Sequence, residues 1–239
     1  MDKQALRERV WDDLDESGEA RFPFPPHDRI PNFAGADDAA AAVADLPEWQ
    51  DAAALKANPD APQLPVRRRV LRADKRVYMA VPRLASERPF RELAPDRLRE
   101  NGVDTNDAAT IGGSEEHGDP VYPGEMTPVD AVVVGSVAVT EDGARVGKGE
   151  GYSDLEFALL REFGLADDET TTITTVHERQ VVEEDVPVGA HDVPLDVVVT
   201  PERTVRTGAG GKPVGIDWDA VTDEQLAEIP VLDRPRDAE

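Results

Sequence analysis

The stretch RVGKGEGYSD, residues 145–154, decides the fold of this chain. An apolar run, residues 131–139, precedes it, and a helical pattern with Leu155, Leu159 and Phe163 on one face follows it. The local order is therefore strand, glycine loop, helix. This order is typical of a parallel α/β unit that carries its ligand at the end of the strand.

The glycine loop has the composition of an anion-binding site. Gly147, Gly149 and Gly151 carry no Cβ, so successive backbone N–H groups can turn toward one anion. Arg145 and Lys148 add positive charge, and the next helix presents its N-terminal N–H groups to the same place. The spacing fits neither a P-loop nor the dinucleotide fingerprint. Phosphate binding and a ligand-free glycine turn both remain open on this pattern alone.

The rest of the chain alternates between helical and strand patterns. A capping box at Thr222 and Gln225 opens a last short helix through residue 228, and the prolines of segment 22–33 require an extended chain. The pattern predicts a single α/β domain over residues 1–239, with a mostly parallel sheet in a three-layer α/β/α arrangement. The other expected helices are 3–15, 37–45, one from Pro47, 65–72 and 93–100, and the expected strands are 77–81, 131–139, 171–176 and 195–200.

The composition is strongly acidic. Fifty Asp and Glu against 26 Lys and Arg give a net charge of −24, and only five of the basic residues are lysines. Such a balance is typical of a halophile, because at about 1 M salt the Debye length falls to about 3 Å and surface repulsion is screened. A basic face for nucleic acid is absent, so the charge argues against nucleic-acid binding.

Several classes of protein are excluded by what the sequence lacks. There is no cysteine, which removes disulfides, thiolate metal sites and cysteine nucleophiles together. No apolar stretch approaches the roughly 20 residues that span a bilayer, and the N-terminus has no signal-peptide pattern. We expect a cytoplasmic protein without a membrane partner, acting as a monomer on a small-molecule substrate.

Residues 145–154 closely resemble the nucleotide loop of the 5-formyltetrahydrofolate cyclo-ligase family, the methenyltetrahydrofolate synthetases. Lys3 and Arg7 match the lysine and arginine of that family's opening helix, and segment 186–200 is similar to its closing strand motif. The branch of methenyltetrahydrofolate synthase domain-containing proteins is closer still, by residues 29–33, 56–60 and 147–151. The resemblance implies a sheet like that of the NagB, RpiA and CoA-transferase proteins.

The resemblance also implies a reaction. Enzymes of the family use Mg-ATP to phosphorylate the formyl oxygen of 5-formyltetrahydrofolate; the neighbouring amine then attacks the carbon and phosphate leaves, giving 5,10-methenyltetrahydrofolate. It implies catalytic roles for Arg145 and Tyr152 and Mg²⁺ ligation by Asp154. It further implies a glutamate in the first half that contacts the formyl group. The ATP site is expected to comprise Lys3, Arg7, Arg145, Gly147, Lys148, Gly149, Glu150, Gly151, Tyr152 and Ser153.

Two positions depart from the cyclo-ligase enzymes. Glu150 places a carboxylate beside the expected triphosphate, which raises its energy unless a metal or Lys148 offsets the charge, and Ser153 replaces an aromatic residue. The alternative is therefore a catalytically altered member that acts as a nucleotide- or folate-binding regulatory module. Some members of the closer branch carry an added RNA-binding domain, for which we expect no room before Glu239.

The remaining charged residues have simpler interpretations. His177 follows an expected strand and is interpreted as a structural histidine in preference to an acid or base. His191 and Asp192 are expected to fix a loop. The run Arg67–Arg69 is expected to be a solvated helix face, and His27 and His117 have no partner spacing for zinc.

Overall fold

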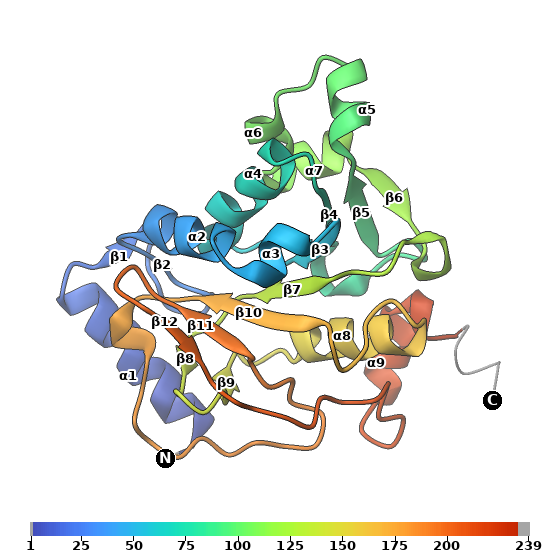
Figure 1. Ribbon diagram of the computed structural model, residues 1–239. Helices are drawn as coiled ribbons and strands as arrows, with labels where there is room; N and C mark the ends of the chain where they lie inside the picture. The colour runs from blue at the N-terminus through green and yellow to red at the C-terminus, as the bar shows by residue number, and fades with distance from the viewer. Residues whose placement is uncertain (1, 234–239) are drawn as a thin grey trace.

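A computed structural model describes residues 2–233 of the chain. Its centre is an eight-stranded sheet in the order β12-β11-β10-β7-β3-β4-β5-β6 (Figure 1). The five strands from β11 to β4 run parallel, and β12, β5 and β6 are antiparallel at the edges. The strands are β3 (Ala54–Ala57), β4 (Arg76–Ala80), β5 (Phe90–Leu93), β6 (Asp119–Val121), β7 (Ala131–Val134), β10 (Thr171–Thr175), β11 (Val197–Val199) and β12 (Thr204–Arg206).

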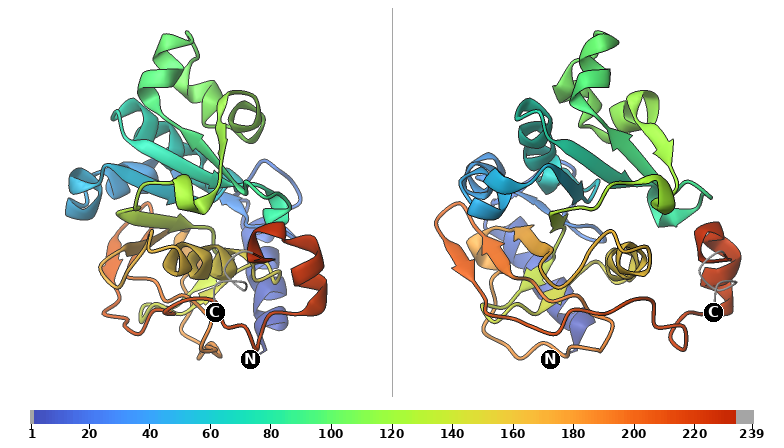
Figure 2. Two further views of the ribbon diagram at one scale, coloured as in Figure 1. Left: turned by 90° about the vertical axis from the view of Figure 1, so that its right-hand side faces the viewer. Right: turned by 45° about the vertical axis from the view of Figure 1, so that its right-hand side comes forward.

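Helices cover both faces of this sheet, as the three-layer prediction requires. Alternate residues of each strand face opposite sides, so β3 sends Leu55 into one core and Ala54 into the other. One face is covered by α2 (Ala36–Ala44), α3 (Pro47–Asp51), α4 (Leu64–Arg72), α5 (Pro95–Glu100) and α6 (Thr105–Ala108), with α7 (Ile111–His117) beside β5. The other is covered by α8 (Tyr152–Glu162) and the C-terminal segment with α9 (Asp223–Glu228), which Figure 2 shows on the α8 side.

Helix α1 (Lys3–Glu16) forms a third, smaller core away from the central sheet. Asp2 caps it by accepting the N–H of Gln4, and its apolar face packs on the short strands β8 (Ala138–Val139) and β9 (Arg145–Val146). The strands β8 and β9 pair antiparallel with each other. This core brings the opening helix against the start of the glycine loop, although the two segments are far apart in sequence.

Most expected elements are confirmed with ends shifted by one or two residues. The expected helix over 155–163 is α8, and the capping box at Thr222 and Gln225 is present at the start of α9. The proline segment 22–33 follows β1 (Ala20–Arg21) and ends in β2 (Asn32–Phe33), which pairs antiparallel with β1. The peptide bonds Phe22–Pro23 and Phe24–Pro25 are cis.

Two predictions about boundaries are wrong. Residues 131–139 form two strands, β7 and β8, in different sheets, because the chain leaves the central sheet at Gly135. Asp60 and Ile30 approach the backbone closely there: a Cβ on Gly135 would lie 2.9 Å from Asp60 Oδ2 and from Ile30. The expected helix 93–100 begins only at Pro95, since Leu93 ends β5. Strands β3, β5, β6 and β12 are too short to give a periodic signal and were not expected.

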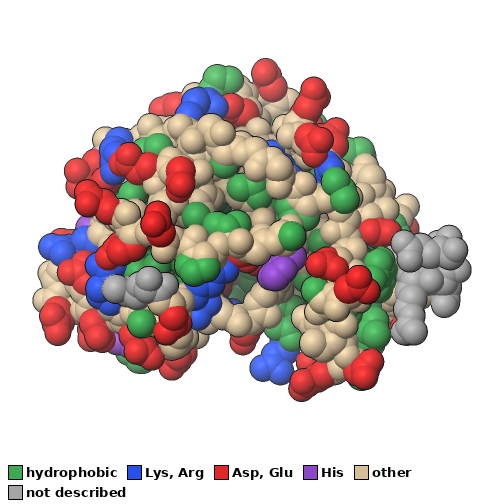
Figure 3. Space-filling model, turned by 90° about the horizontal axis from the view of Figure 1, so that it is seen from below, with side chains coloured by type: hydrophobic (Ala, Val, Ile, Leu, Met, Phe, Trp, Pro, Cys, Tyr) green, Lys and Arg blue, Asp and Glu red, His purple; other side chains and the backbone are tan. Residues whose placement is uncertain are grey.

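The acidic charge is distributed over the surface. In Figure 3, Asp and Glu side chains are scattered across the visible face, while Lys and Arg gather beside a hollow near its middle. No helix within residues 2–233 is both long and apolar enough to span a membrane.

Candidate functional site

A pocket of about 310 Å³ opens where the parallel strands β3, β4 and β7 end and α8 begins. Segments that follow these strands line it: residues 58–60 after β3, 81–83 after β4, and Gly135 after β7. The carboxyl ends of parallel strands are where open α/β sheets bind ligands. The whole glycine loop from Gly147 to Asp154 also lines this pocket.

The backbone of the loop requires glycine at two of its positions. Gly149 has a φ of +112° and Gly151 a φ of +74°, conformations that side chains disfavour. A Cβ on Gly149 would also lie 3.3 Å from Arg7 Cζ. Gly151 is the residue before α8, and no side chain caps that helix, so its first N–H groups are left for a ligand.

Two cations from α1 line the pocket, as the family resemblance implies, and one of them contacts the loop. Arg7 Nε donates to the carbonyl oxygen of Gly147 at 2.7 Å. Burial lowers the pKa of Arg7, with Asp2 acting in the opposite direction. Lys3 Nζ lies 2.7 Å from Asp192 Oδ2. Both cations line the pocket with the glycine loop, although about 140 residues separate Arg7 from Gly147.

Asp192 connects α1 to the closing segment of the chain. Burial alone would raise its pKa, but the N–H of Gly189 and the ammonium of Lys3 donate to the carboxylate and lower the pKa below its usual value. The Gly189 N–H lies 2.8 Å from Asp192 Oδ2. This geometry agrees with the loop-fixing role expected for Asp192.

Arg145 is buried beneath the loop and anchors it on two sides. Its Nη1 donates to Gly135 O at 3.0 Å, and its Nη2 donates to both carboxylate oxygens of Asp154, at 2.7 and 2.6 Å. Its Nε is buried and has no acceptor among the described residues. Asp154 Oδ1 also accepts the N–H of Val193 at 3.0 Å. The guanidinium is thus held at the pocket wall by a carboxylate from the first turn of α8.

Whether the pocket can bind a divalent cation depends on the carboxylates in the loop. Within residues 2–233 no three His, Asp or Glu side chains are grouped as metal ligands. Mg²⁺ bound through phosphates needs only one or two carboxylates, and Asp154 keeps one unused lone pair, on Oδ2, because Oδ1 already accepts from both Arg145 and Val193. Glu150 pairs with Lys148 at 2.8 Å, so a lysine offsets the extra carboxylate of the loop.

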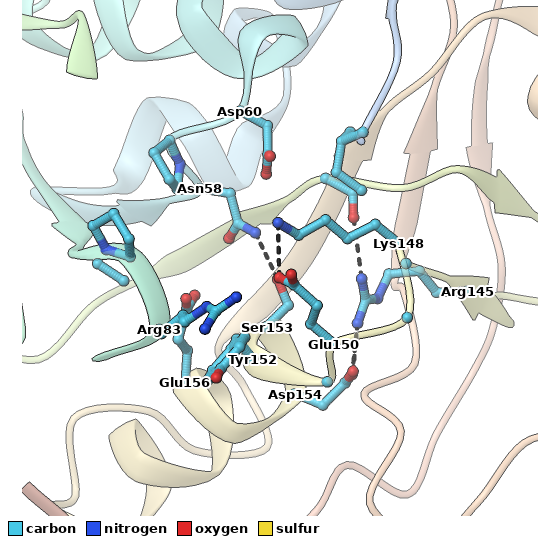
Figure 4. Close-up of a pocket in the computed structure, with 18 of the residues that line it drawn as sticks. Asn58, Asp60, Arg83, Arg145, Lys148, Glu150, Tyr152, Ser153, Asp154 and Glu156 are labelled. Carbon is cyan, nitrogen blue, oxygen red and sulfur yellow. Dashed lines mark hydrogen bonds and ion pairs between the residues drawn. The ribbon is translucent and has the colours of Figure 1, made fainter. Parts of the chain in front are cut away.

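The opposite wall of the pocket contains a polar cluster that the sequence reasoning missed (Figure 4). Lys56, with no exposed surface, pairs with Glu156 and donates to Asn58 Oδ1 at 2.5 Å. Asn58 Nδ2 donates to Ser153 Oγ, also at 2.5 Å. Ser153, the residue that replaces an aromatic, is therefore bonded to the segment after β3. One signal could have found the cluster: a lone lysine inside the apolar run Ala54–Ala57.

The expectation that Arg67–Arg69 form a solvated face is wrong for Arg67. Arg67 is 1% exposed and donates to the backbone carbonyls of Asn58 and Asp60, at 2.5 and 3.0 Å. Burial lowers its pKa to about 10, with Asp60 acting in the opposite direction. Arg67 therefore fixes the segment that presents Asn58 and Asp60 to the pocket.

Three further side chains complete the lining of the pocket. Burial raises the pKa of Asp60, although Lys148 and Arg67 oppose the shift. Tyr152 is partly buried against the α8 core and lines the pocket at the helix start. Arg83 also lines it, on a left-handed backbone with a φ of 57°. His177 caps a short helical turn by accepting the N–H of Arg179, away from this pocket.

The fold and the pocket define an α/β protein with a glycine loop at a helix N-terminus, where cations from α1, β9 and the loop line one pocket. The sequence model of the 5-formyltetrahydrofolate cyclo-ligase family matches residues 1–201. The chain belongs to this family.

Similar proteins agree with this assignment. The chain is 42% identical to the mouse (Mus musculus) methenyltetrahydrofolate synthase domain-containing protein and 38% identical to the human (Homo sapiens) protein of that name. These alignments cover 100% and 97% of this chain but 64% and 61% of the relatives, so the chain spans less than two thirds of their length.

A solved structure shares the fold. It is the NMR structure of the Aquifex aeolicus 5,10-methenyltetrahydrofolate synthetase, with a TM-score of 0.54 and 19% identity. The similarity covers 92% of this chain and 100% of that protein. The mostly parallel sheet with helices on both faces is therefore the cyclo-ligase fold, as the sequence predicts.

Proposed function

We propose that this chain catalyses the ATP-dependent cyclisation of 5-formyltetrahydrofolate to 5,10-methenyltetrahydrofolate. In this reaction the formyl oxygen takes the γ-phosphoryl group of ATP and ADP is released. The neighbouring amine then attacks the activated carbon, and phosphate leaves. Catalysis of this kind depends on positioning and on charge stabilisation around the moving phosphoryl group.

One observation carries the proposal: cations from three segments surround a single glycine loop. Lys3 and Arg7 come from α1, Arg145 from β9 and Lys148 from the loop, and all four line the same pocket. In a strongly acidic protein, such a concentration of positive charge at a helix N-terminus favours a polyanion. Its position at the carboxyl ends of β3, β4 and β7 supports a site that also takes a second substrate.

Each part of the site would then have a distinct role. The N–H groups of the loop and of the first turn of α8 would bind phosphate oxygens, while Lys3, Arg7 and Arg145 would neutralise them. Arg145 would act through its charge, since Nη1 and Nη2 are already bonded and Nε is buried. Tyr152, at the start of α8, would separate the nucleotide from the folate. Mg²⁺, when bound beside Asp154, would screen the charge of the phosphates.

Asp60 is the side chain that best fits the formyl contact. It follows β3, lines the pocket and has a pKa raised by burial. A carboxyl group of raised pKa keeps its proton to a higher pH than usual and can donate it to a carbonyl oxygen. On this proposal the chain acts in the cytoplasm, as a monomer, on a reduced folate with ATP and Mg²⁺.

The test measures formation of the methenyl product by the absorbance of that product. The purified chain is incubated in high-salt buffer with 5-formyltetrahydrofolate and Mg-ATP, and again without ATP. We expect product only with ATP, and we expect Arg145→Ala to lower the rate at least 100-fold. Arg99→Ala is the matched control, because Arg99 is exposed and pairs with Asp74 outside the pocket.

Absence of turnover, under conditions in which a family enzyme is active, would contradict the proposal. If there is no turnover, calorimetry shows whether the chain still binds ATP or folate or has lost the site. Binding of ATP or folate without turnover would instead support the nucleotide- or folate-binding module for which Glu150 and Ser153 are the sequence arguments.

A further inference from the structure

We infer that Glu156 and Ser153 bind the amino-pyrimidinone edge of the pterin ring and so select the folate substrate. The inference rests on the proposed function, because it assigns one wall of the same pocket to the substrate. Glu156, Ser153 and Asn58 line that wall.

The direction of α8 separates this wall from the phosphate site. Successive residues of an α-helix are turned by about 100°, so side chains two positions apart point to nearly opposite sides. Asp154 faces Arg145 and Val193, whereas Glu156 faces β3 through Lys56. Figure 4 shows Arg83 and Glu156 at one end of the pocket and Arg145 at the other. A ligand on Glu156 therefore lies on the side away from the buried guanidinium.

Glu156 has one carboxylate oxygen to spare. Its Oε2 pairs with Lys56, and its Oε1 has no hydrogen-bond partner among the described residues. The side chain is 8% exposed and lines the pocket, so its remaining surface belongs to the pocket wall. An oxygen that faces a pocket and has no protein donor is free to accept from a ligand in place of water.

Lys56 and Asn58 hold this carboxylate in place. Lys56 comes from β3 with its side chain fully buried, and it donates to both Glu156 and Asn58. The ammonium balances the negative charge, so a ligand need not bring a cation. The ligand should instead be a neutral group that presents N–H donors.

Ser153 supplies the complementary donor. Its Oγ accepts a hydrogen bond from Asn58 Nδ2, and no described residue accepts its hydroxyl proton. The wall therefore offers an acceptor at Glu156 and a donor at Ser153. A 2-amino-4-oxopteridine edge carries two adjacent N–H donors beside a carbonyl acceptor, which is the matching pattern. Adenine fits less well. On both of its exposed edges a ring nitrogen acceptor lies next to the amino group, so this nitrogen would face the carboxylate, which is also an acceptor.

The experiment measures binding and turnover on the same preparations. Calorimetry gives the Kd of 5-formyltetrahydrofolate, of its analogue lacking the 2-amino group, and of Mg-ATP. For the unaltered chain we expect the analogue to bind about 10- to 100-fold more weakly, because it leaves the carboxylate without a donor. In Glu156→Gln we expect the affinity for 5-formyltetrahydrofolate to fall by the same factor, so that the variant binds folate and analogue equally. The Kd of Mg-ATP should change less than twofold.

A second variant keeps the inference testable if Glu156→Gln folds poorly. The pair Lys56→Met with Glu156→Gln removes both charges together, and it should show the same loss of discrimination. Equal affinity of the unaltered chain for folate and analogue, or discrimination that survives in both variants, overturns the inference. Tighter binding of folate than of the analogue, without turnover, would contradict the proposed reaction and support the inference. Turnover without this difference in affinity would support the reaction and overturn the inference.

Discussion

Arg145 and Asp154 close the glycine loop: one guanidinium nitrogen donates to both carboxylate oxygens, at 2.7 and 2.6 Å, across nine residues of chain. The pair joins the start of β9 to the first turn of α8. The side chains are only 6% and 13% exposed, so the interaction is poorly screened by water and salt. The same arginine therefore fixes both ends of the loop.

Replacing Arg145 by lysine should show how much of its effect comes from the positive charge and how much from the planar shape of the guanidinium. Arg145→Lys keeps the cation, but an ammonium cannot reproduce the planar guanidinium contacts to Gly135 and Asp154. We expect kcat/KM to fall at least 10-fold and the free energy of unfolding to fall by about 2 kcal/mol. Steady-state kinetics and urea unfolding measure the two effects. A lysine variant with unaltered kinetics would show that only the charge matters.

Lys56 should be essential to stability only while Glu156 is present. Lys56→Met leaves a buried carboxylate without its cation, which is expected to lower the free energy of unfolding by about 3–5 kcal/mol. In the double variant Lys56→Met with Glu156→Leu, the expected loss is below about 1 kcal/mol, since two apolar side chains replace the pair. Urea unfolding of both variants and of Glu156→Leu completes the cycle. Additive losses would show that the two groups do not interact.

Asp60 should make the protein less stable as the pH rises. Burial raises its pKa in the folded state, so the folded chain binds this proton more tightly than the unfolded chain. The resulting stability is complete below the unfolded pKa and is lost as the pH rises through the folded pKa. Asp60→Asn should therefore stabilise the fold at neutral pH, by on the order of 1 kcal/mol, with the gain vanishing on acidification. Unfolding midpoints at several pH values measure this difference, and a gain that persists at acidic pH would contradict it.

Gly149 should tolerate no side chain. Its φ of +112° lies outside the region open to alanine, and a Cβ would press on Arg7. Gly149→Ala is expected to weaken ATP binding at least 10-fold by moving the loop and the arginine together. Gly210→Ala, which has open space and no positive φ, is the control and should bind ATP normally. Calorimetry with Mg-ATP compares the two variants.

The sequence predicts much of the glycine-loop side of the pocket. Glycines on alternate positions, basic residues beside them and an amphipathic helix afterwards are local signals, and α8 begins where they place it. Arg7 was expected near the loop only through resemblance, because as a helix-surface cation it has no local pattern that names its partner. The contact with Gly147 depends on the small core between α1 and the strands β8 and β9.

The cluster of Lys56, Asn58 and Glu156 could not be predicted in this way. Lys56 and Glu156 are 100 residues apart, and although a lysine in an apolar run indicates a buried charge, it does not name the partner. Arg67 lies in a run of three arginines, and only the packing of α4 shows that the first of them is buried. The break at Gly135 is equally non-local, since it depends on the approach of Asp60 and Ile30 to a strand that is apolar throughout.

By itself, the sequence determined the α/β class, the glycine loop at residues 145–154 and the acidic surface, because periodicity, glycine spacing and charge are properties of neighbouring residues. Only the tertiary structure decided which charges meet. It buried Lys56 under Glu156, turned Arg67 onto the backbone of Asn58 and Asp60, and placed Arg7 on the glycine loop. Burial removes the solvation of a charge, so each of these side chains required a partner that the fold had to bring from elsewhere in the chain.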